Sequence, residues 1–203
     1  LKVNKFFVGL DLGQAQDYTA LVAIERKAYR YDPRPYEYHI RHLERPKLGT
    51  PYPAIVEQVQ ALMRSRQLLN QATLVVDATG VGRPVVDLFR KAGLRPVAIT
   101  ITGGNTVTVG DGGYHVPKRD LVTTLQVLFQ SGRLKVAGRL PLAPVLIEEL
   151  LNFKVKINVK TAHDSYEAWR EGVHDDLVLA AALACWYGEK RSFIRPVQKP
   201  EGW

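Results

Sequence analysis

The sequence predicts one α/β domain, built on a mixed central β-sheet with helices on both faces. Three strand-like segments follow one another near the start of the chain with only short turns between them, which indicates an antiparallel meander. After them, helix-like and strand-like segments alternate, which favours parallel strands covered by helices. The length of 203 residues fits a single domain. We therefore expect one domain over 1–203, with a core of about 5–190 and a C-terminal tail over 191–203.

The meander strands are expected at 5–12, 18–27 and 36–45. The first is almost continuously apolar, as in Phe7-Val8-Gly9-Leu10, which is typical of a strand that is buried on both faces. The second alternates in polarity. The third is more polar, so we place it near the edge of the sheet.

Proline and glycine mark the ends of several expected helices. Pro53, Pro84 and Pro117 each open a segment with apolar residues at the 3.6-residue period, and Gly93 closes the second of these. The last helix is apolar almost all round, so it should be buried on most sides. The expected helices are 53–69, 84–92, one from 117 onward, 140–153 and 175–187, and the expected strands between them are 73–77 and 97–102.

Two further segments have their own patterns. Five glycines between Gly103 and Gly113 predict a mobile loop. Residues 154–160 alternate in polarity like a strand, and we expect them to pair with 165–169 as a hairpin.

The charge balance suggests a polyanionic partner. Lys and Arg total 28 and Asp and Glu total 20, which gives a net charge of +8 and a pI near 9.6. Nucleic acid is the commonest partner of a domain this basic. One cysteine, Cys185, excludes an internal disulfide and a cysteine-rich metal site. Because it lies in an apolar helical segment, we expect a buried thiol. A single cysteine fits a reducing compartment, and we expect the cytoplasm.

Neither a membrane span nor a signal peptide is indicated. No stretch reaches 18 consecutive apolar residues, and the first residues lack a long apolar core. The chain begins with Leu1 rather than Met, so we expect that it was cut from a longer protein.

Carboxylates stand at unusual places in this sequence. Asp11 and Asp77 each end an apolar strand, and Asp175 and Asp176 begin the most apolar helix. Burying a carboxylate costs several kcal/mol unless a cation or hydrogen-bond donors compensate for it. Taken singly, each has an ordinary alternative, as a turn residue or a helix N-cap. Taken together, they can converge at one sheet edge, where a hard divalent cation would offset their repulsion.

Other catalytic patterns are absent from the sequence. There is no Walker A motif, no GxSxG and no HExxH, and the Gly80-Val81-Gly82 segment is only part of a dinucleotide fingerprint. Of the five histidines, His174 alone adjoins the suspected acids. We expect it to support them or cap the helix rather than to bind metal.

Three short motifs carry a family resemblance. Gly9-Leu10-Asp11-Leu12-Gly13, Val75-Val76-Asp77-Ala78-Thr79-Gly80 and His174-Asp175-Asp176-Leu177 before an alanine-rich helix resemble the ribonuclease H-like nuclease domain of viral terminase large subunits, which package phage DNA. The segment Val116-Pro117-Lys118-Arg119-Asp120-Leu121 resembles a helix start between the second and third acids of that family. The resemblance covers roughly 5–190 and implies a ribonuclease H-like fold.

The resemblance also implies an activity. It indicates a two-metal-ion endonuclease for double-stranded DNA that uses Mg²⁺ or Mn²⁺. Asp11 would be the shared ligand on the first strand, Asp77 would hold one ion and Asp176 the other, with Asp175 as a helper or alternative. Alternatives are another ribonuclease H-like nuclease such as a junction resolvase, a non-catalytic DNA-binding packaging module, and an actin-like ATPase or sugar kinase, for which the chain leaves no room for a second lobe.

Partners follow from the same resemblance. A complete terminase large subunit carries an ATPase motor before this domain, and it works with a portal and a small terminase subunit. The absence of that motor here indicates either a cut chain or a stand-alone relative.

Lysine and arginine side chains that contact the DNA backbone would give affinity with little sequence preference. The candidates are Arg83, Lys118, Arg119, Lys154, Lys156 and Lys160, and the expected 154–169 hairpin could clamp the duplex.

Overall fold

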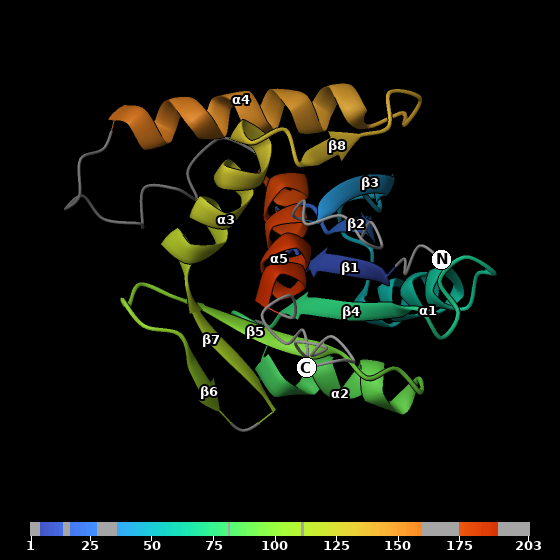
Figure 1. The fold of residues 1–203 in the computed structure, drawn as a ribbon. Helices are drawn as coiled ribbons and strands as arrows, with labels where there is room; N and C mark the ends of the chain where they lie inside the picture. The colour runs from blue at the N-terminus through green and yellow to red at the C-terminus, as the bar shows by residue number, and fades with distance from the viewer. Residues whose placement is uncertain are drawn as a thin grey trace, which may run out of the picture.

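The computed structural model describes residues 5–13, 17–27, 36–80, 82–110, 112–159 and 175–190. In this part of the chain, eight strands form one mixed sheet in the order β6-β7-β5-β4-β1-β2-β3-β8 (Figure 1). The strands are β1 (Lys5–Asp11), β2 (Ala20–Lys27), β3 (Glu37–Glu44), β4 (Ala72–Asp77), β5 (Val97–Thr102), β6 (Thr108–Gly110), β7 (Gly113–Pro117) and β8 (Leu134–Val136), and the helices are α1 (Tyr52–Met63), α2 (Gly82–Lys91), α3 (Lys118–Gln130), α4 (Ala143–Val159) and α5 (Asp176–Lys190).

The pairing of the strands confirms the predicted mixed sheet. β1, β2 and β3 form the antiparallel meander. β4 pairs in parallel with β1, β5 with β4, and β7 with β5. β3 lies near the sheet edge as expected, and β8, which the sequence analysis did not predict, pairs with it in parallel on the outer side.

Helices cover both faces of the sheet, and each face has its own core. On one face, residues of α3, α4 and α5 pack with Phe7, Val22 and Val75. On the other face, residues of α1 and α2 pack with Val8 and Val76. Neighbouring residues of β1 and β4 thus enter opposite cores, as the two-residue period of a strand requires.

The glycine-rich segment is not a continuous loop, so that prediction was wrong. β6 and β7 form an antiparallel hairpin within it, in which Gly110 pairs with Gly113. The two residues between them are Asp111 and Gly112, and Gly112 has a φ of +95°. Asp-Gly is a strong two-residue hairpin signal because glycine readily adopts positive φ.

Residues 154–159 are helical, so the predicted strand and clamp hairpin over 154–169 were wrong there. α4 extends to Val159, beyond the expected end at Phe153. Extending an existing helix adds one hydrogen bond for each residue fixed, whereas the short alternating pattern offers a new strand little support. The expected partner strand, 165–169, lies outside the described residues.

α1 ends at Met63, earlier than the sequence predicted. Leu68 is nevertheless buried, whereas Leu69 is half exposed. Turns that follow the helix, with backbone hydrogen bonds from Leu68 and Leu69 to the Ser65 carbonyl, bring Leu68 into the core. The apolar pattern therefore reports burial here rather than helix.

α5 crosses the middle of the sheet against β1 (Figure 1). Gly9 of β1 makes this contact possible, because a Cβ there would overlap the Ala180 carbonyl and lie 3.2 Å from the Ala184 Cβ. The small residues of both elements thus bring helix and strand close together. None of the described helices has the length and apolarity that a membrane crossing needs.

We predict that Gly9→Ala destabilises the protein by about 3 kcal/mol or more, because α5 must move away from the sheet. Urea unfolding measures this change. Gly138→Ala is the matched control, since a Cβ at Gly138 meets no atom within 4 Å. Equal unfolding midpoints for the Gly9 variant and the wild type would contradict the packing described above.

We also predict that Cys185 does not react with a thiol reagent in the native protein. The side chain is buried in α5, and this burial raises the pKa of the thiol far above its ordinary value. Titration with a chromogenic disulfide should show one thiol in urea and none in buffer. Rapid reaction in buffer would show that α5 is not packed as described.

Candidate active site

Asp11 and Asp77 stand at the ends of two neighbouring parallel strands. The register pairs Gly9 with Val75 and Leu10 with Val76, so the next position along places Asp11 beside Asp77. Both side chains lie on the α5 face, because Gly9 and Val75, two residues earlier, face α5 or its core. The strand ends therefore bring two carboxylates together on one face.

α5 brings the third carboxylate to the same place. Ala180 lies over Gly9, and Tyr187, farther along α5, contacts Phe7, so the helix start lies toward the Asp11 end of β1. Asp176 is the first residue of α5, and the carbonyl of Asp175 accepts the hydrogen bond from Leu179 N at 2.9 Å. Asp175 thus holds the N-cap position, which the sequence analysis weighed as its ordinary role.

The charges of these acids affect one another. Burial, and then the charges of Asp77, Asp176, Asp175 and Asp17, raise the pKa of Asp11 well above its ordinary value. Asp77 and Asp176 are each only 7% exposed. Like-charged carboxylates in a poorly solvated site resist ionisation together. A cation at this place would reverse that effect.

A backbone N–H group orients the carboxylate of Asp77. Its Oδ1 accepts a hydrogen bond from Thr79 N at 2.7 Å. Thr79 is in turn held by β5, because its Oγ1 accepts from Ile101 N at 2.7 Å. The chain after β4 therefore turns tightly around the acid and orients it.

Asp176 belongs to a second network, which the sequence analysis did not find. Glu149 of α4 accepts a hydrogen bond from Val178 N at 3.1 Å and forms an ion pair with Arg45, the residue after β3. Arg45 Nη2 also lies 3.5 Å from Asp176 Oδ2. Burial raises the pKa of Glu149 to about 7, against the opposing effects of the Val178 N–H and Arg45.

The donor set suits a hard divalent cation, although the side chains do not form a closed ligand sphere. Among the described residues, no three His, Cys, Asp or Glu side chains already lie where together they could hold a metal ion. Carboxylate oxygens are nevertheless the ligands that Mg²⁺ and Mn²⁺ prefer. The concentration of negative charge around Asp11 is what such an ion would neutralise.

The predicted DNA-binding residues are spread over the molecule. Lys118 and Arg119 begin α3 directly after β7. Arg119 is half exposed and donates to the Asn105 carbonyl at 2.8 Å, which ties α3 to the loop between β5 and β6. The backbone places Arg83 in the first turn of α2 and Lys154 and Lys156 in α4, and Lys160 and His174 lie outside the described residues.

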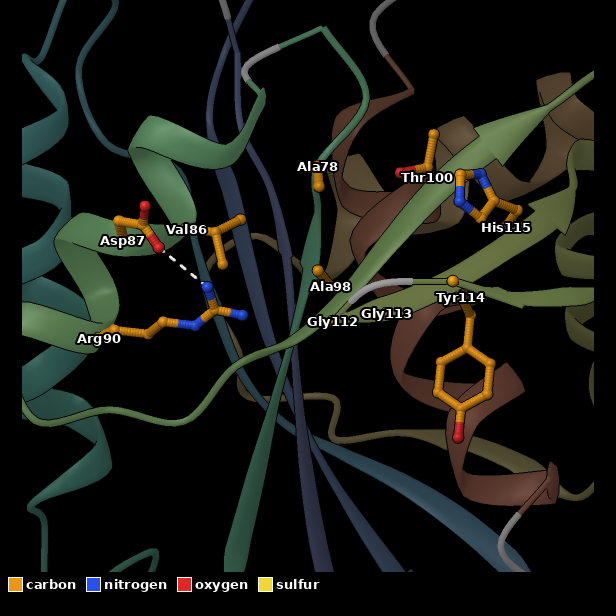
Figure 2. A pocket seen from close by; sticks show the side chains of 11 residues that line it. Ala78, Val86, Asp87, Arg90, Ala98, Thr100, Gly112, Gly113, Tyr114 and His115 are labelled. Atoms are coloured by element: carbon orange, nitrogen blue, oxygen red, sulfur yellow. Dashed lines mark hydrogen bonds and ion pairs between the residues drawn. The ribbon is translucent and has the colours of Figure 1, made fainter.

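A separate cleft of about 500 Å³ opens on the opposite face of the sheet. Figure 2 shows Asp87 and Arg90 of α2 on one side and His115 of β7 on the other, with Asp87 and Arg90 paired at 2.9 Å. Ala78 lines this cleft, whereas Asp77, one residue earlier, belongs to the acid cluster. The two sites therefore use consecutive residues at the end of β4.

Sequence reasoning missed Arg45, Glu149 and Asp17. Glu149 had a readable signal, because Leu146 and Leu150 bury the same helical face, and a carboxylate among them needs a partner. Arg45 and Asp17 lie in ordinary turn contexts. Their positions depend on tertiary contacts.

Comparisons with known proteins agree with this geometry. Residues 8–186 match the family described as the terminase RNaseH-like domain. No curated protein sequence matches the chain. The large terminase nuclease of the thermophilic phage G20c is 20% identical, with a TM-score of 0.57 over 89% of this chain and 81% of that one. The human cytomegalovirus terminase nuclease domain, in a structure soaked with Mn and bound to an inhibitor, is 16% identical, with a TM-score of 0.55 over 95% of this chain and 87% of that one.

Structural likeness at these identities establishes the ribonuclease H-like fold, and the family match covers most of the chain. The chain belongs to the family of terminase RNaseH-like domains.

Proposed function

We propose that this domain is a metal-dependent endonuclease that hydrolyses double-stranded DNA with little sequence preference, as in the cutting of concatemeric DNA during viral genome packaging. The observation that carries the proposal is the convergence of Asp11, Asp77 and Asp176 from three elements onto one face of the sheet. The raised pKa of Asp11 supports it, because each neighbouring carboxylate adds to that effect.

Two Mg²⁺ or Mn²⁺ ions would be held by Asp11, Asp77 and Asp176, with Asp175 as helper and Asp11 shared between them. Bound ions of this kind activate a water molecule and stabilise the leaving oxygen of a phosphodiester. The Mn-soaked cytomegalovirus relative supports the choice of ion. In this chain, the Thr79 N–H orients Asp77, and the packing of α5 on Gly9 places Asp176.

The substrate assignment depends on charge and on the sheet edge. A net charge of +8 favours a polyanion. The register aligns Asp77 with Ile99 and Ile99 with Tyr114, so Lys118 follows β7 at the same strand-end edge of the sheet as Asp77. Contacts from lysine and arginine to phosphates carry affinity but no sequence information. Arg83, Lys118, Arg119, Lys154, Lys156 and Lys160 remain the proposed DNA-binding residues.

The wider assembly is also part of the proposal. In a full-length terminase large subunit, this domain would follow an ATPase motor and meet the portal and the small subunit. His174 would support the acids beside it.

We predict that Asp11→Asn lowers the cleavage of supercoiled plasmid in Mn²⁺ by more than about 100-fold, because it removes a shared ligand, whereas loss of a residue that only supports a ligand typically costs 10–100-fold. The circular dichroism spectrum should stay unchanged. Asp87→Asn is the matched control, since Asp87 is half exposed and pairs with Arg90 away from the acids.

Undiminished cutting by the Asp11 variant would refute the ligand assignment. Preferential cutting of four-way junctions over linear duplex would indicate a resolvase instead. Equal DNA binding in chelator and in Mg²⁺, without nicking, would indicate a non-catalytic packaging module.

We further predict that Asp11→Asn stabilises the metal-free protein at neutral pH. A carboxyl with a raised pKa holds its proton more tightly when folded, so its contribution to stability is lost as pH rises from the ordinary value of 3.8 toward the raised one. In EDTA, the unfolding free energy of the wild type should fall across this range, and that of the variant should fall less. Urea unfolding at a series of pH values measures both.

Adding Mn²⁺ should reverse the order of stability. A ligand at 100 times its dissociation constant stabilises the native state by about 2.7 kcal/mol. The wild type should gain this amount at neutral pH and Asp11→Asn should gain much less. Equal gains for the two proteins would place the ion away from Asp11.

A further inference from the structure

We propose that Arg45, held in place by Glu149, is a positioning residue for Asp176 and determines the affinity of the acid cluster for its divalent cation. This inference rests on the proposed function, in which Asp176 holds an ion. It assigns roles to two residues that join β3 and α4 to the site.

Glu149 holds both Arg45 and the start of α5 in place. Its side chain is 5% exposed, and its two carboxylate oxygens have separate partners. Oε2 accepts from Val178 N in the first turn of α5, and Oε1 pairs with Arg45. One carboxylate therefore fixes both the start of α5, where N–H groups lack helical partners, and the guanidinium beside it.

Arg45 connects Glu149 to the acid cluster. Its Nη2 bonds to Glu149 and lies 3.5 Å from Asp176 Oδ2. The ring of Tyr18 faces the guanidinium, with 5.1 Å from its centroid to the Arg45 Cζ. The guanidinium is thus held by a ring and two carboxylates, and its position restrains the carboxylate of Asp176.

Stability alone does not account for this arginine. A buried ion pair often contributes no more to stability than apolar residues of similar volume. Arg45 Nε is also buried without a hydrogen-bond partner among the described residues, which is costly for a charged donor. Such local costs are concentrated at functional sites.

Two effects of opposite sign follow from the position of Arg45. Its positive charge close to a ligand oxygen opposes a divalent cation, so it weakens metal binding. Its hold on the Asp176 carboxylate keeps that ligand in place, so it favours turnover. A residue that only stabilises the fold would change neither property in the folded protein.

Calorimetric titration with Mn²⁺ alone, and single-turnover plasmid cleavage at saturating Mn²⁺, separate the two effects. We expect Arg45→Gln to bind Mn²⁺ at least about fivefold more tightly. Two unit charges about 4 Å apart repel by about 1 kcal/mol even in water, which is a factor of about five in affinity. We expect its cleavage rate to fall by about 10–100-fold. Its affinity for DNA in chelator should be unchanged.

Arg45→Lys separates charge from geometry. It keeps the positive charge, so Mn²⁺ affinity should stay near that of the wild type. It loses the planar guanidinium that faces the Tyr18 ring and holds Nη2 between Glu149 and Asp176, so the cleavage rate should still fall. Arg41→Gln is the matched control on β3, the strand that Arg45 follows, because Arg41 pairs with Glu25 at 2.8 Å, and both readouts should be unchanged.

If Arg45→Gln fails to fold, the double variant Arg45→Gln/Glu149→Gln removes the carboxylate left unpaired, and the same two measurements apply.

Wild-type values of Mn²⁺ affinity and cleavage rate in the folded variant would overturn the proposal. A wild type that binds Mn²⁺ but cuts no DNA would refute the proposed function alone, since the calorimetric comparison still decides the role of Arg45. A wild type that binds no Mn²⁺ would overturn both.

Discussion

The contact between α5 and Gly9 of β1 determines the geometry of the whole site. A side chain at Gly9 would overlap the backbone of α5 at Ala180, so only glycine lets the helix lie this close to the sheet. Because Asp11 follows Gly9 by one pleat and Asp176 precedes Ala180 by one turn, the same contact that packs the core also sets the two carboxylates near each other. Packing and chemistry are therefore specified by one small residue.

Repulsion between carboxylates is the second constraint on the structure. Burial and the charges of the neighbouring acids raise the pKa of Asp11, and the fold offsets part of the negative charge with the Thr79 N–H at Asp77 and with Arg45 at Asp176. Both neighbours also orient the carboxylates they contact. The compensation is partial, so the site carries an excess of negative charge that a divalent cation would neutralise.

The sequence predicted the sheet and the acids because both depend on local patterns. Strand periodicity, a carboxylate after an apolar strand and an alanine-rich last helix can be read directly. The hairpin of β6 and β7 was missed because glycines suggested a loop, although Asp111-Gly112 is a hairpin signal. The helical end of α4 was missed because its short alternating pattern favours a strand, whereas extending the existing helix adds one hydrogen bond for each residue fixed. Arg45 escaped prediction because its partners come from α4 and α5, far away in the sequence.

The acid cluster draws on β1, β4 and the start of α5, which lie far apart along the chain and meet only through the finished tertiary structure. α5 is the last of these elements to leave the ribosome. A nascent chain, or one in which α5 has detached, therefore brings at most two of the three principal carboxylates together. Assembly of the cluster is thus coupled to completion of folding, which keeps incomplete molecules from acquiring the full set of acids.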